Sequence, residues 1–405
     1  MFKTTPLVIV EDKDALRAVV DQLLHQPAIA VDTEADSLHH YQEKLCLIQI
    51  SDPGMDVIVD TLKVEDLTPL REVFSNPDQV KVLHGADYDV VSLKRDFGFE
   101  TRNIFDTMLA SQFLGFERIG LADLIHRFFG LEIDKHFQRH DWAQRPLLDE
   151  HLDYARGDTH WLLALREVLS YKLEKVGRLE HVLEECRFVE SREWSGRGSD
   201  PSSDFLRVKG ASGFSEGSLR VLRALVNYRN DSARDLDRPA FKVIPDDRLL
   251  AHAADPPRTP EELHQVVRPG TPLHRRHAEG LLAAVARGLA DEAPLPQRPR
   301  ASSARQPVAE GGGERLLLPL KAWRNEVVQQ QGFSPAVVAN NNLLKEIARL
   351  APTTVEALAQ VPGVRSWQVR DFGKQIVALV QSTLTEQRPA RSKRRRRRRK
   401  TPAGT

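Results

Sequence analysis

The chain has 405 residues, of which 41% are hydrophobic and 28% are charged, a composition that is typical of two or three folded domains and excludes a wholly disordered chain. Its only cysteines, Cys46 and Cys186, exclude a disulfide framework and lack the spacing of zinc ligands. No apolar run approaches the roughly 18 residues of a membrane span, and acidic residues follow the first apolar stretch too early for a signal peptide, so we expect a cytoplasmic protein without membrane contact.

The formal net charge of +1 conceals an uneven distribution of charge along the chain. The stretch RSKRRRRRRK at residues 391–400 holds nine basic residues, and removing them from the total leaves −8 for the rest. We therefore expect residues 386–405 to form a disordered basic tail on a mildly acidic body. Such a tail can bind nucleic-acid phosphates by releasing counterions, and the alternative is a solvated terminus without a dedicated partner.

Residues 1–170 alternate between predicted strands and predicted helices. Short apolar runs bounded by turn residues predict strands at 28–34, 45–51, 56–60 and 80–84. The first three strands follow one another through short connections, which favours antiparallel pairing, whereas helical stretches separate the later ones, which favours parallel pairing. The sequence therefore predicts a mixed sheet with helices packed on it.

The helices of this region follow from the spacing of apolar residues. That spacing predicts helices at 64–76 and 88–98, and the second should end at Gly98. From 104 to 190 the pattern is mostly helical. Together with the strands, these helices indicate an α/β domain at residues 1–190.

Two segments rich in Ser, Gly, Pro and Ala are predicted to be linkers, at 191–213 and 291–314. They separate two smaller helical domains, at 214–290 and 315–385. These two domains resemble each other in three places, taken in the same order, which indicates a duplication. The matching places are Tyr228-Arg229-Asn230 with Trp323-Arg324-Asn325, Leu249-Leu250 with Leu343-Leu344, and 256–263 with 351–358.

An acidic pair follows the first predicted strand, in the sequence AIAVDTEAD at residues 28–36. Side chains alternate between the two faces of a strand, so Asp32 and Glu34 should lie side by side on one face. Burying unpaired carboxylates is costly, and a solvated strand end is the alternative explanation. The meaning of the pair therefore depends on which other groups the domain brings to the same place.

Further candidates lie on two predicted helices. Asp89 lies in a first helical turn, where an Asp can also be only a cap or a dipole partner. Tyr154 and Asp158 are four residues apart and therefore share a helix face. Four carboxylates at one site would repel one another, and divalent cations that prefer hard oxygen ligands, Mg²⁺ or Mn²⁺, would offset that repulsion. Two such cations about 4 Å apart can hold a phosphodiester between its attacking and leaving oxygens.

Other conspicuous residues are expected to have structural roles. Asp87 and Asp106 are predicted to cap helices, and His84 is predicted to close a strand. Trp142 either shapes a substrate groove or belongs to the core. The histidines within 126–181 share no metal-ligand spacing and are expected on the surface or in packing contacts.

Three acidic motifs in order resemble those of the DEDD superfamily of 3′→5′ exonucleases, in the subclass with a tyrosine in the last motif, and within it the bacterial ribonuclease D family. The motifs are AVDTEAD with Asp32 and Glu34, LHGADYDVVSLKRDFG with Asp89, and YARGDTHWLL with Tyr154 and Asp158. The connecting stretches FDTMLASQFLG and KHFQRHDWAQRPL are similar as well. The resemblance covers about 28–170 and implies a ribonuclease-H-like mixed sheet flanked by helices.

The resemblance implies that Asp32, Glu34, Asp89 and Asp158 bind two divalent metal ions, Mg²⁺ or Mn²⁺. Tyr154 would orient the attacking water, since a phenol with a pKa near 10 is a poor base. The implied reaction releases nucleoside 5′-monophosphates from the 3′ end of RNA, and transfer-RNA precursors are the implied substrates. A DNA 3′→5′ exonuclease remains an alternative, because metal chemistry does not distinguish the two sugars. A scaffold with an inactive nuclease fold is a further alternative, which the presence of all five site residues disfavours.

The two C-terminal helical domains resemble HRDC domains, which are small nucleic-acid-binding modules. Tyr228 stands in the first copy where Trp is commoner, and neither copy has an obviously basic sequence. RNA is expected to contact the exonuclease groove, the HRDC domains and the Arg-rich tail. No G-x-x-x-x-G-K-[ST] motif occurs, so the chain is not expected to be a helicase itself.

Overall fold

The structure, a computed structural model, divides the chain into two compact units, Met1–Ala304 and Arg305–Thr405. It describes residues 5–194, 201–266, 272–296 and 313–385. The predicted basic tail at 386–405 therefore lies outside the described residues. Among the helices within the described ranges, none has the length and the apolar character that crossing a membrane requires.

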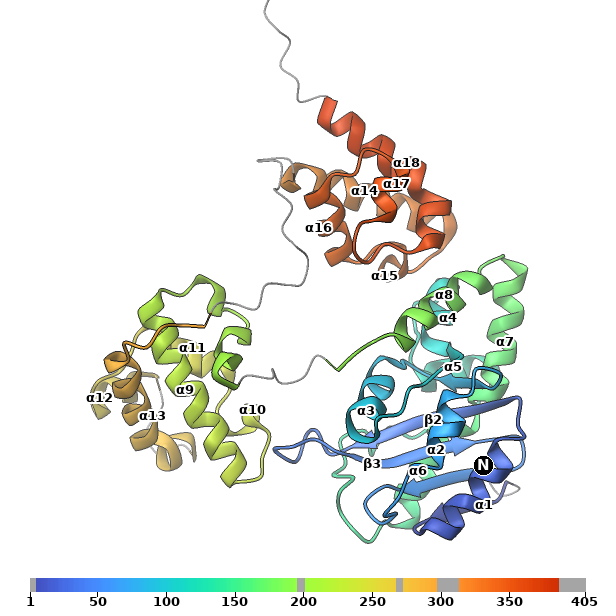
Figure 1. The fold of residues 1–405 in the computed structure, drawn as a ribbon, viewed down its shortest axis with the longest axis horizontal. Helices are drawn as coiled ribbons and strands as arrows, with labels where there is room; N and C mark the ends of the chain where they lie inside the picture. Colours follow the sequence, from blue (N-terminus) through green and yellow to red (C-terminus); the bar gives the residue numbers. More distant parts are fainter. Residues whose placement is uncertain (1–4, 195–200, 267–271, 297–312, 386–405) are drawn as a thin grey trace, which may run out of the picture. The chain divides into compact units, whose positions relative to one another are not determined.

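A six-stranded mixed sheet forms the centre of the N-terminal domain (Figure 1). Its strand order is β1-β4-β3-β2-β5-β6. Its strands are β1 (Leu7–Val10), β2 (Ala28–Ala35), β3 (Leu45–Ser51), β4 (Asp56–Asp60), β5 (Val80–Leu83) and β6 (Ile104–Asp106). β3 pairs antiparallel with β2 and β4, whereas the outer pairs are parallel. The predicted mixed sheet and its pairing directions are confirmed. Strands β1, with four residues, and β6, with three, were not predicted.

Helices surround this sheet, and the first of them was not predicted from the sequence. They are α1 (Lys13–Leu23), α2 (Leu70–Ser75), α3 (Asp87–Phe97), α4 (Thr107–Phe113), α5 (Leu121–Phe129), α6 (Asp149–His160), α7 (Leu162–Lys175) and α8 (Leu179–Glu190). The predicted helix at 64–76 is wrong in its first half, since the helix begins only after Pro69, which has no N–H for an intrahelical bond. The predicted end of α3 at Gly98 is confirmed, and this residue has the left-handed φ of +67° that favours glycine.

Helix α6 packs against the three central strands β2, β3 and β4. Strands β3 and β4 are buried along their whole length, as expected for strands covered by helices on both faces. This arrangement holds α6 firmly against the sheet, close to the C-terminal half of β2. The site described below is built from these two elements and from α3.

The first helical domain contains α9 (Glu216–Asp235), α10 (Ala240–Val243), α11 (Asp246–Ala254), α12 (Pro260–Val266) and α13 (Pro272–Ala290). Two short 3₁₀ helices, Pro201–Arg207 and Ala211–Gly213, precede α9. Phe205 and Ala211 are buried in the core of this domain. The linker predicted at 191–213 is therefore too long, because its second half belongs to the helical domain although Ser, Asp and Gly dominate its composition.

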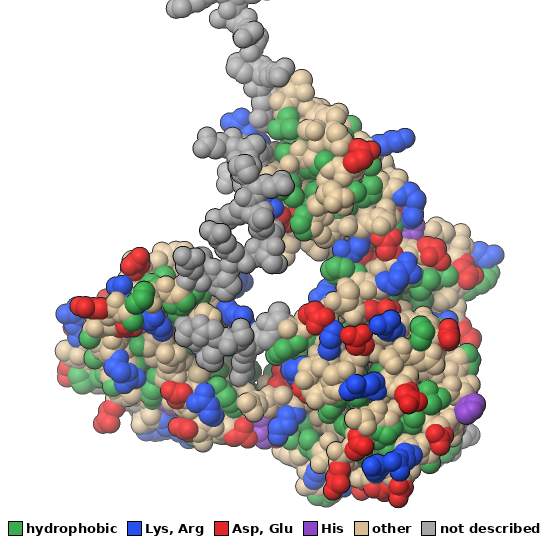
Figure 2. Space-filling model, in the orientation of Figure 1, with side chains coloured by type: hydrophobic (Ala, Val, Ile, Leu, Met, Phe, Trp, Pro, Cys, Tyr) green, Lys and Arg blue, Asp and Glu red, His purple; other side chains and the backbone are tan. Residues whose placement is uncertain are grey.

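The C-terminal unit contains α14 (Gly313–Gln331), α15 (Pro335–Val338), α16 (Asn341–Leu350), α17 (Val355–Ala359) and α18 (Ser366–Thr385). This order of long and short helices repeats that of α9 to α13. The matching arginines also have matching contacts: Arg229 pairs with Asp246 at the start of α11, and Arg324 donates to Oδ1 of Asn341 at the start of α16 at 3.0 Å. On the visible face of each unit, basic and acidic side chains are interspersed rather than gathered by sign (Figure 2).

Candidate active site

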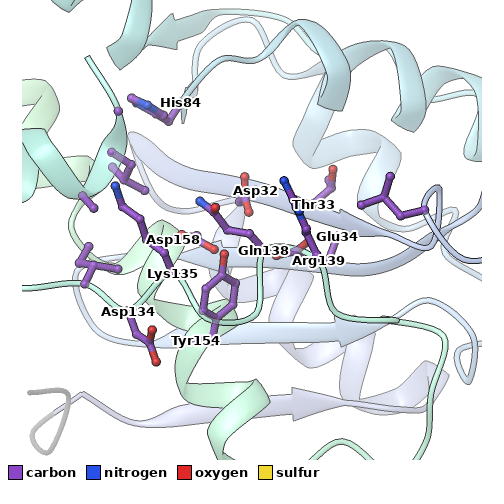
Figure 3. A pocket seen from close by; sticks show the side chains of 15 residues that line it. Asp32, Thr33, Glu34, His84, Asp134, Lys135, Gln138, Arg139, Tyr154 and Asp158 are labelled. Carbon is purple, nitrogen blue, oxygen red and sulfur yellow. The ribbon is translucent and has the colours of Figure 1, made fainter. Parts of the chain in front are cut away.

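The C-terminal half of β2 brings the first acidic pair to the wall of a pocket (Figure 3). Alternation along the strand directs Asp32 and Glu34 to the same side, and α6 presents Asp158 to them. One carboxylate oxygen from each of these three residues lies within 4.8 Å of the other two. The structure thus brings together three predicted site residues from two distant parts of the sequence.

Asp89 on α3 lies next to this group but is not one of the three residues within 4.8 Å of one another. Its Oδ1 accepts a hydrogen bond of 2.6 Å from the hydroxyl of Thr33, which lies between Asp32 and Glu34 on β2. Repulsion from Asp89 raises the pKa of Asp32 more than repulsion from any other acid does. Asp89 is therefore close enough to Asp32 for its charge to raise the pKa of that carboxyl.

The pKa values of these carboxylates show that their charge is poorly compensated. Burial, followed by repulsion from neighbouring acids, raises the pKa of Asp32 and of Glu34 well above the ordinary values. Burial also raises the pKa of Asp89 to about 6 and that of Asp158 to about 7. A set of hard oxygen ligands that lacks positive charge fits divalent metal ions, and the donor set alone does not choose between Mg²⁺ and Mn²⁺.

Helix α6 carries Tyr154 and Asp158 on one face and is anchored through another. Buried Asp56 on β4 accepts a hydrogen bond of 3.0 Å from Nε of Arg156, and Nδ1 of His160 lies 2.9 Å from the same carboxylate. Residues four apart share a helix face, so this anchor fixes the rotation of α6 about its axis. It thereby determines the direction in which Tyr154 and Asp158 project.

Aromatic side chains hold Tyr154 in place. Its ring centroid lies 5.9 Å from that of Phe137 and 5.8 Å from that of Trp142. Trp142 is only 1% exposed, so it belongs to the core and supports Tyr154 from there. Burial, followed by repulsion from the three acids of the pocket, raises the pKa of Tyr154 above its ordinary value. The phenol therefore keeps its proton at neutral pH, which suits a group that orients water better than one that removes a proton.

The pocket has a volume of about 560 Å³, and basic and amide side chains line it together with the acids. Lys135, Gln138 and Arg139 extend over the pocket from the segment between α5 and α6 (Figure 3). All three are exposed and can contact the phosphates and bases of a strand whose end lies at the acids. These residues could not be assigned to the site from the sequence, because no periodicity in a loop indicates where a side chain points.

Three residues were expected to have structural roles, and the prediction had a different outcome for each of them. Asp106 caps α4 by accepting a hydrogen bond of 2.8 Å from the N–H of Met108, as predicted. Asp87 is not a cap, because it is itself the first residue of α3 and pairs at 2.9 Å with Arg192. His84 does more than follow a strand, because it lines the pocket.

Comparison with protein families identifies each folded part of the chain. Residues 7–174 match a 3′-5′ exonuclease family, and residues 218–285 and 314–380 both match the HRDC domain. The two helical domains are therefore two copies of one type of domain. Both resemblances inferred from the sequence are confirmed.

Relatives cover most of the chain. Ribonuclease D of Granulibacter bethesdensis is 32% identical over 385 residues, which are 93% of this chain and 92% of the relative. Ribonuclease D of Desulfotalea psychrophila is 31% identical over 368 residues, which are 90% and 96% of the two chains. Protein RRP6-like 2 of Arabidopsis thaliana is 31% identical over 300 residues, or 70% of this chain, but this chain spans only 34% of that longer protein.

Solved structures agree with this assignment. RNase D of Escherichia coli has the same fold, with a TM-score of 0.71 and 23% identity over 93% of this chain and 99% of that one. The catalytic core of RRP6 from Trypanosoma brucei has a TM-score of 0.60 and 32% identity, and the match covers 72% of this chain and 81% of that one. The chain therefore belongs to the ribonuclease D family of 3′→5′ exoribonucleases.

Proposed function

We propose that the chain hydrolyses the last phosphodiester of RNA and releases a nucleoside 5′-monophosphate. The convergence of Asp32, Glu34 and Asp158 within 4.8 Å of one another, with Asp89 beside Asp32, carries this proposal. Four poorly compensated carboxylates suit two divalent cations, Mg²⁺ or Mn²⁺. When bound, such cations would lower the pKa of the attacking water and offset the negative charge on the leaving oxygen.

The side chains around the acids would bind and orient the reactants. Tyr154 keeps its proton, so its hydroxyl would orient the attacking water through hydrogen bonding without acting as the base. Lys135 and Arg139 line the same pocket and would bind phosphate oxygens of the RNA. Thr33 would hold the carboxylate of Asp89 in position through its hydrogen bond of 2.6 Å.

The proposed substrate is RNA with a free 3′ end in the cytoplasm, transfer-RNA precursors among them. This part of the proposal is supported by likeness to RNase D of Escherichia coli, which is described as an exoribonuclease involved in structured RNA processing. We propose that the exonuclease groove, both HRDC domains and the Arg-rich segment at 391–400 contact the RNA. The proposed limits are 1–190 for the exonuclease domain, and 214–290 and 315–385 for the HRDC domains, with Pro201–Gly213 joined to the first.

To test this proposal, the full chain is incubated with matched RNA and DNA strands that are labelled near the 5′ end. The reactions contain Mg²⁺, Mn²⁺ or EDTA. We expect stepwise shortening and release of mononucleotides from RNA in the presence of either metal, and none in EDTA. Preference for DNA would support a deoxyribonuclease instead. Inactivity with every metal would support a scaffold with an inactive nuclease fold.

A further inference from the structure

His84 follows strand β5 and lies in the wall of the pocket that holds the acidic group (Figure 3). Its Nδ1 lies 2.9 Å from the hydroxyl oxygen of Thr107, and this hydroxyl donates to the backbone carbonyl of Leu83 at 3.0 Å. A hydroxyl has only one proton to donate. Both contacts are hydrogen bonds only if Thr107 donates to Leu83 and Nδ1 of His84 donates to Thr107, so we assign the hydrogen of the neutral ring to Nδ1.

The other ring nitrogen of His84, Nε2, is consequently a hydrogen-bond acceptor. Burial lowers the pKa of His84 to about 4, so the ring is neutral at pH 7 and has a lone pair on Nε2. The two ring nitrogens point in diverging directions, so Nε2 faces away from Thr107. Within the described part of the chain, Nε2 has no protein hydrogen-bond partner and is not a buried atom. Nε2 is therefore an accessible acceptor on a residue that lines the pocket.

The chemistry of RNA restricts what this acceptor can bind. A phosphodiester has no proton to donate, so a phosphate suits Lys135 and Arg139 in the same pocket but does not suit Nε2. The donors of RNA are its ribose hydroxyls and the N–H groups of its bases. An enzyme that removes successive nucleotides meets bases whose donors differ in position, whereas every nucleotide presents a ribose.

We propose that Nε2 of His84 accepts a hydrogen bond from a ribose hydroxyl at the 3′ end of bound RNA. This inference rests on the proposed function and adds a contact to the sugar that does not depend on the base. A site built to bind a substrate hydroxyl rejects an analogue that lacks it, because a polar group of the site is then left without its partner. A contact with the 2′-hydroxyl would favour RNA over DNA, and a contact with the 3′-hydroxyl would favour an unblocked end.

The test compares His84→Asn with His84→Gln. The amide of Asn takes roughly the position of Nδ1, so this variant keeps a partner for Thr107 and loses the acceptor in the pocket. The longer Gln side chain reaches roughly the position of Nε2. The substrates are a short RNA, the same RNA with one 2′-deoxy sugar at the last or next-to-last nucleotide, and the same RNA with a 3′-deoxy end. Circular dichroism and thermal unfolding check that each variant is folded.

We expect the wild-type kcat/KM to fall about tenfold on one of these analogues, as for the loss of one hydrogen bond. In His84→Asn, kcat/KM on the full RNA should fall by a similar factor, and the analogue should cause no further loss. His84→Gln should recover part of the difference. An equal penalty for the analogue in the wild type and in His84→Asn would overturn the inference. A loss in His84→Asn that follows the identity of the terminal base would overturn it too.

Affinity measured in Ca²⁺ by fluorescence anisotropy makes the inference testable without turnover. The wild type should bind the RNA more tightly than the analogue, and His84→Asn should bind both alike. If the wild type hydrolysed no strand with any metal, the proposed function would fail while this difference in affinity would still support the contact. Equal affinities of the wild type for the RNA and for all analogues would contradict the contact itself.

Discussion

Helix α6 faces buried carboxylates on two sides, and only on one side is their negative charge compensated. On one side, burial alone would raise the pKa of Asp56, but hydrogen bonds lower it below its ordinary value, and they come from His160, Ser51 and Arg156. On the other side, burial raises the pKa values of Asp32, Glu34 and Asp158, and mutual repulsion adds to the shift at the first two. The fold thus compensates the carboxylate that anchors α6 and leaves the carboxylates of the pocket free to bind a cation.

Replacing Asp32 by Asn should have the largest effect on activity. We expect a fall in kcat on the order of 10³-fold or more, because Asp32 acts together with the other carboxylates of the site and its loss disables them as a unit. The variant should be as stable as the wild type in EDTA or more stable, because the substitution removes a repelling charge. Single-turnover hydrolysis of labelled RNA and thermal unfolding measure the two effects. Near-normal turnover would show that Asp32 is not a site residue.

Replacing Asp56 by Asn should have the opposite effect on stability. Arg156 would keep its buried charge and lose the negative charge that faces it, which we expect to lower the free energy of unfolding by about 3 kcal/mol. Urea unfolding of Asp56→Asn and Asp32→Asn under the same conditions measures the difference. Equal stabilities of the two variants would contradict the contrast between the two sides of α6.

The stability of the metal-free chain should fall as the pH rises. Asp158 and Asp89 have pKa values of about 7 and about 6 in the folded chain, whereas an unfolded Asp titrates near 4. The folded chain therefore binds protons that the unfolded chain has released, so the free energy of unfolding declines between about pH 4 and pH 7. In EDTA, Tm should drop more from pH 5 to pH 8 in the wild type than in Asp158→Asn, and Mg²⁺ should reduce the drop. Identical pH profiles would contradict the raised pKa values.

Tyr154→Phe should have a smaller effect than the loss of a carboxylate. We expect kcat to fall by about 10- to 100-fold, because the water loses its orientation while the acids remain in place. Affinity for Mn²⁺, measured by calorimetry, should stay unchanged. The pH–rate profile should keep its shape, since Tyr154 stays protonated on both the acidic and the basic side of the profile. Loss of one limb in the variant would show that Tyr154 acts as an acid or a base.

Deleting residues 391–400 should have the smallest effect on hydrolysis. The deletion removes nine basic residues, so we expect weaker RNA binding and a flatter dependence of log affinity on log salt concentration. Binding titrations at several salt concentrations measure the slope. An unchanged slope would mean that these side chains do not contact the RNA.

Local periodicity was sufficient to predict which site residues share a face. The spacing of Asp32 and Glu34 along a strand, and of Tyr154 and Asp158 along a helix, gave the sides that the structure shows. Short connections between the first predicted strands likewise indicated the antiparallel centre of the sheet. These features depend on neighbours in the sequence.

Contacts between distant segments could not be predicted in the same way. Asp56 lies 100 residues before Arg156, and Thr33 lies 56 residues before Asp89. Each pair meets only because α6 or α3 packs against the sheet in one orientation. Lys135 lies in a loop without periodicity, so nothing in the sequence indicated that it faces the pocket. These tertiary contacts supply the anchor and the basic lining of the site.

The most direct test of the central claim is to locate the cations. Anomalous diffraction from crystals of the full chain soaked in Mn²⁺ would show how many ions bind and which oxygens hold them. We predict two peaks about 4 Å apart, held by the carboxylates of Asp32, Glu34, Asp89 and Asp158. Mn²⁺ held elsewhere, or this acidic group left empty in crystals of a chain that Mn²⁺ activates, would contradict the claim.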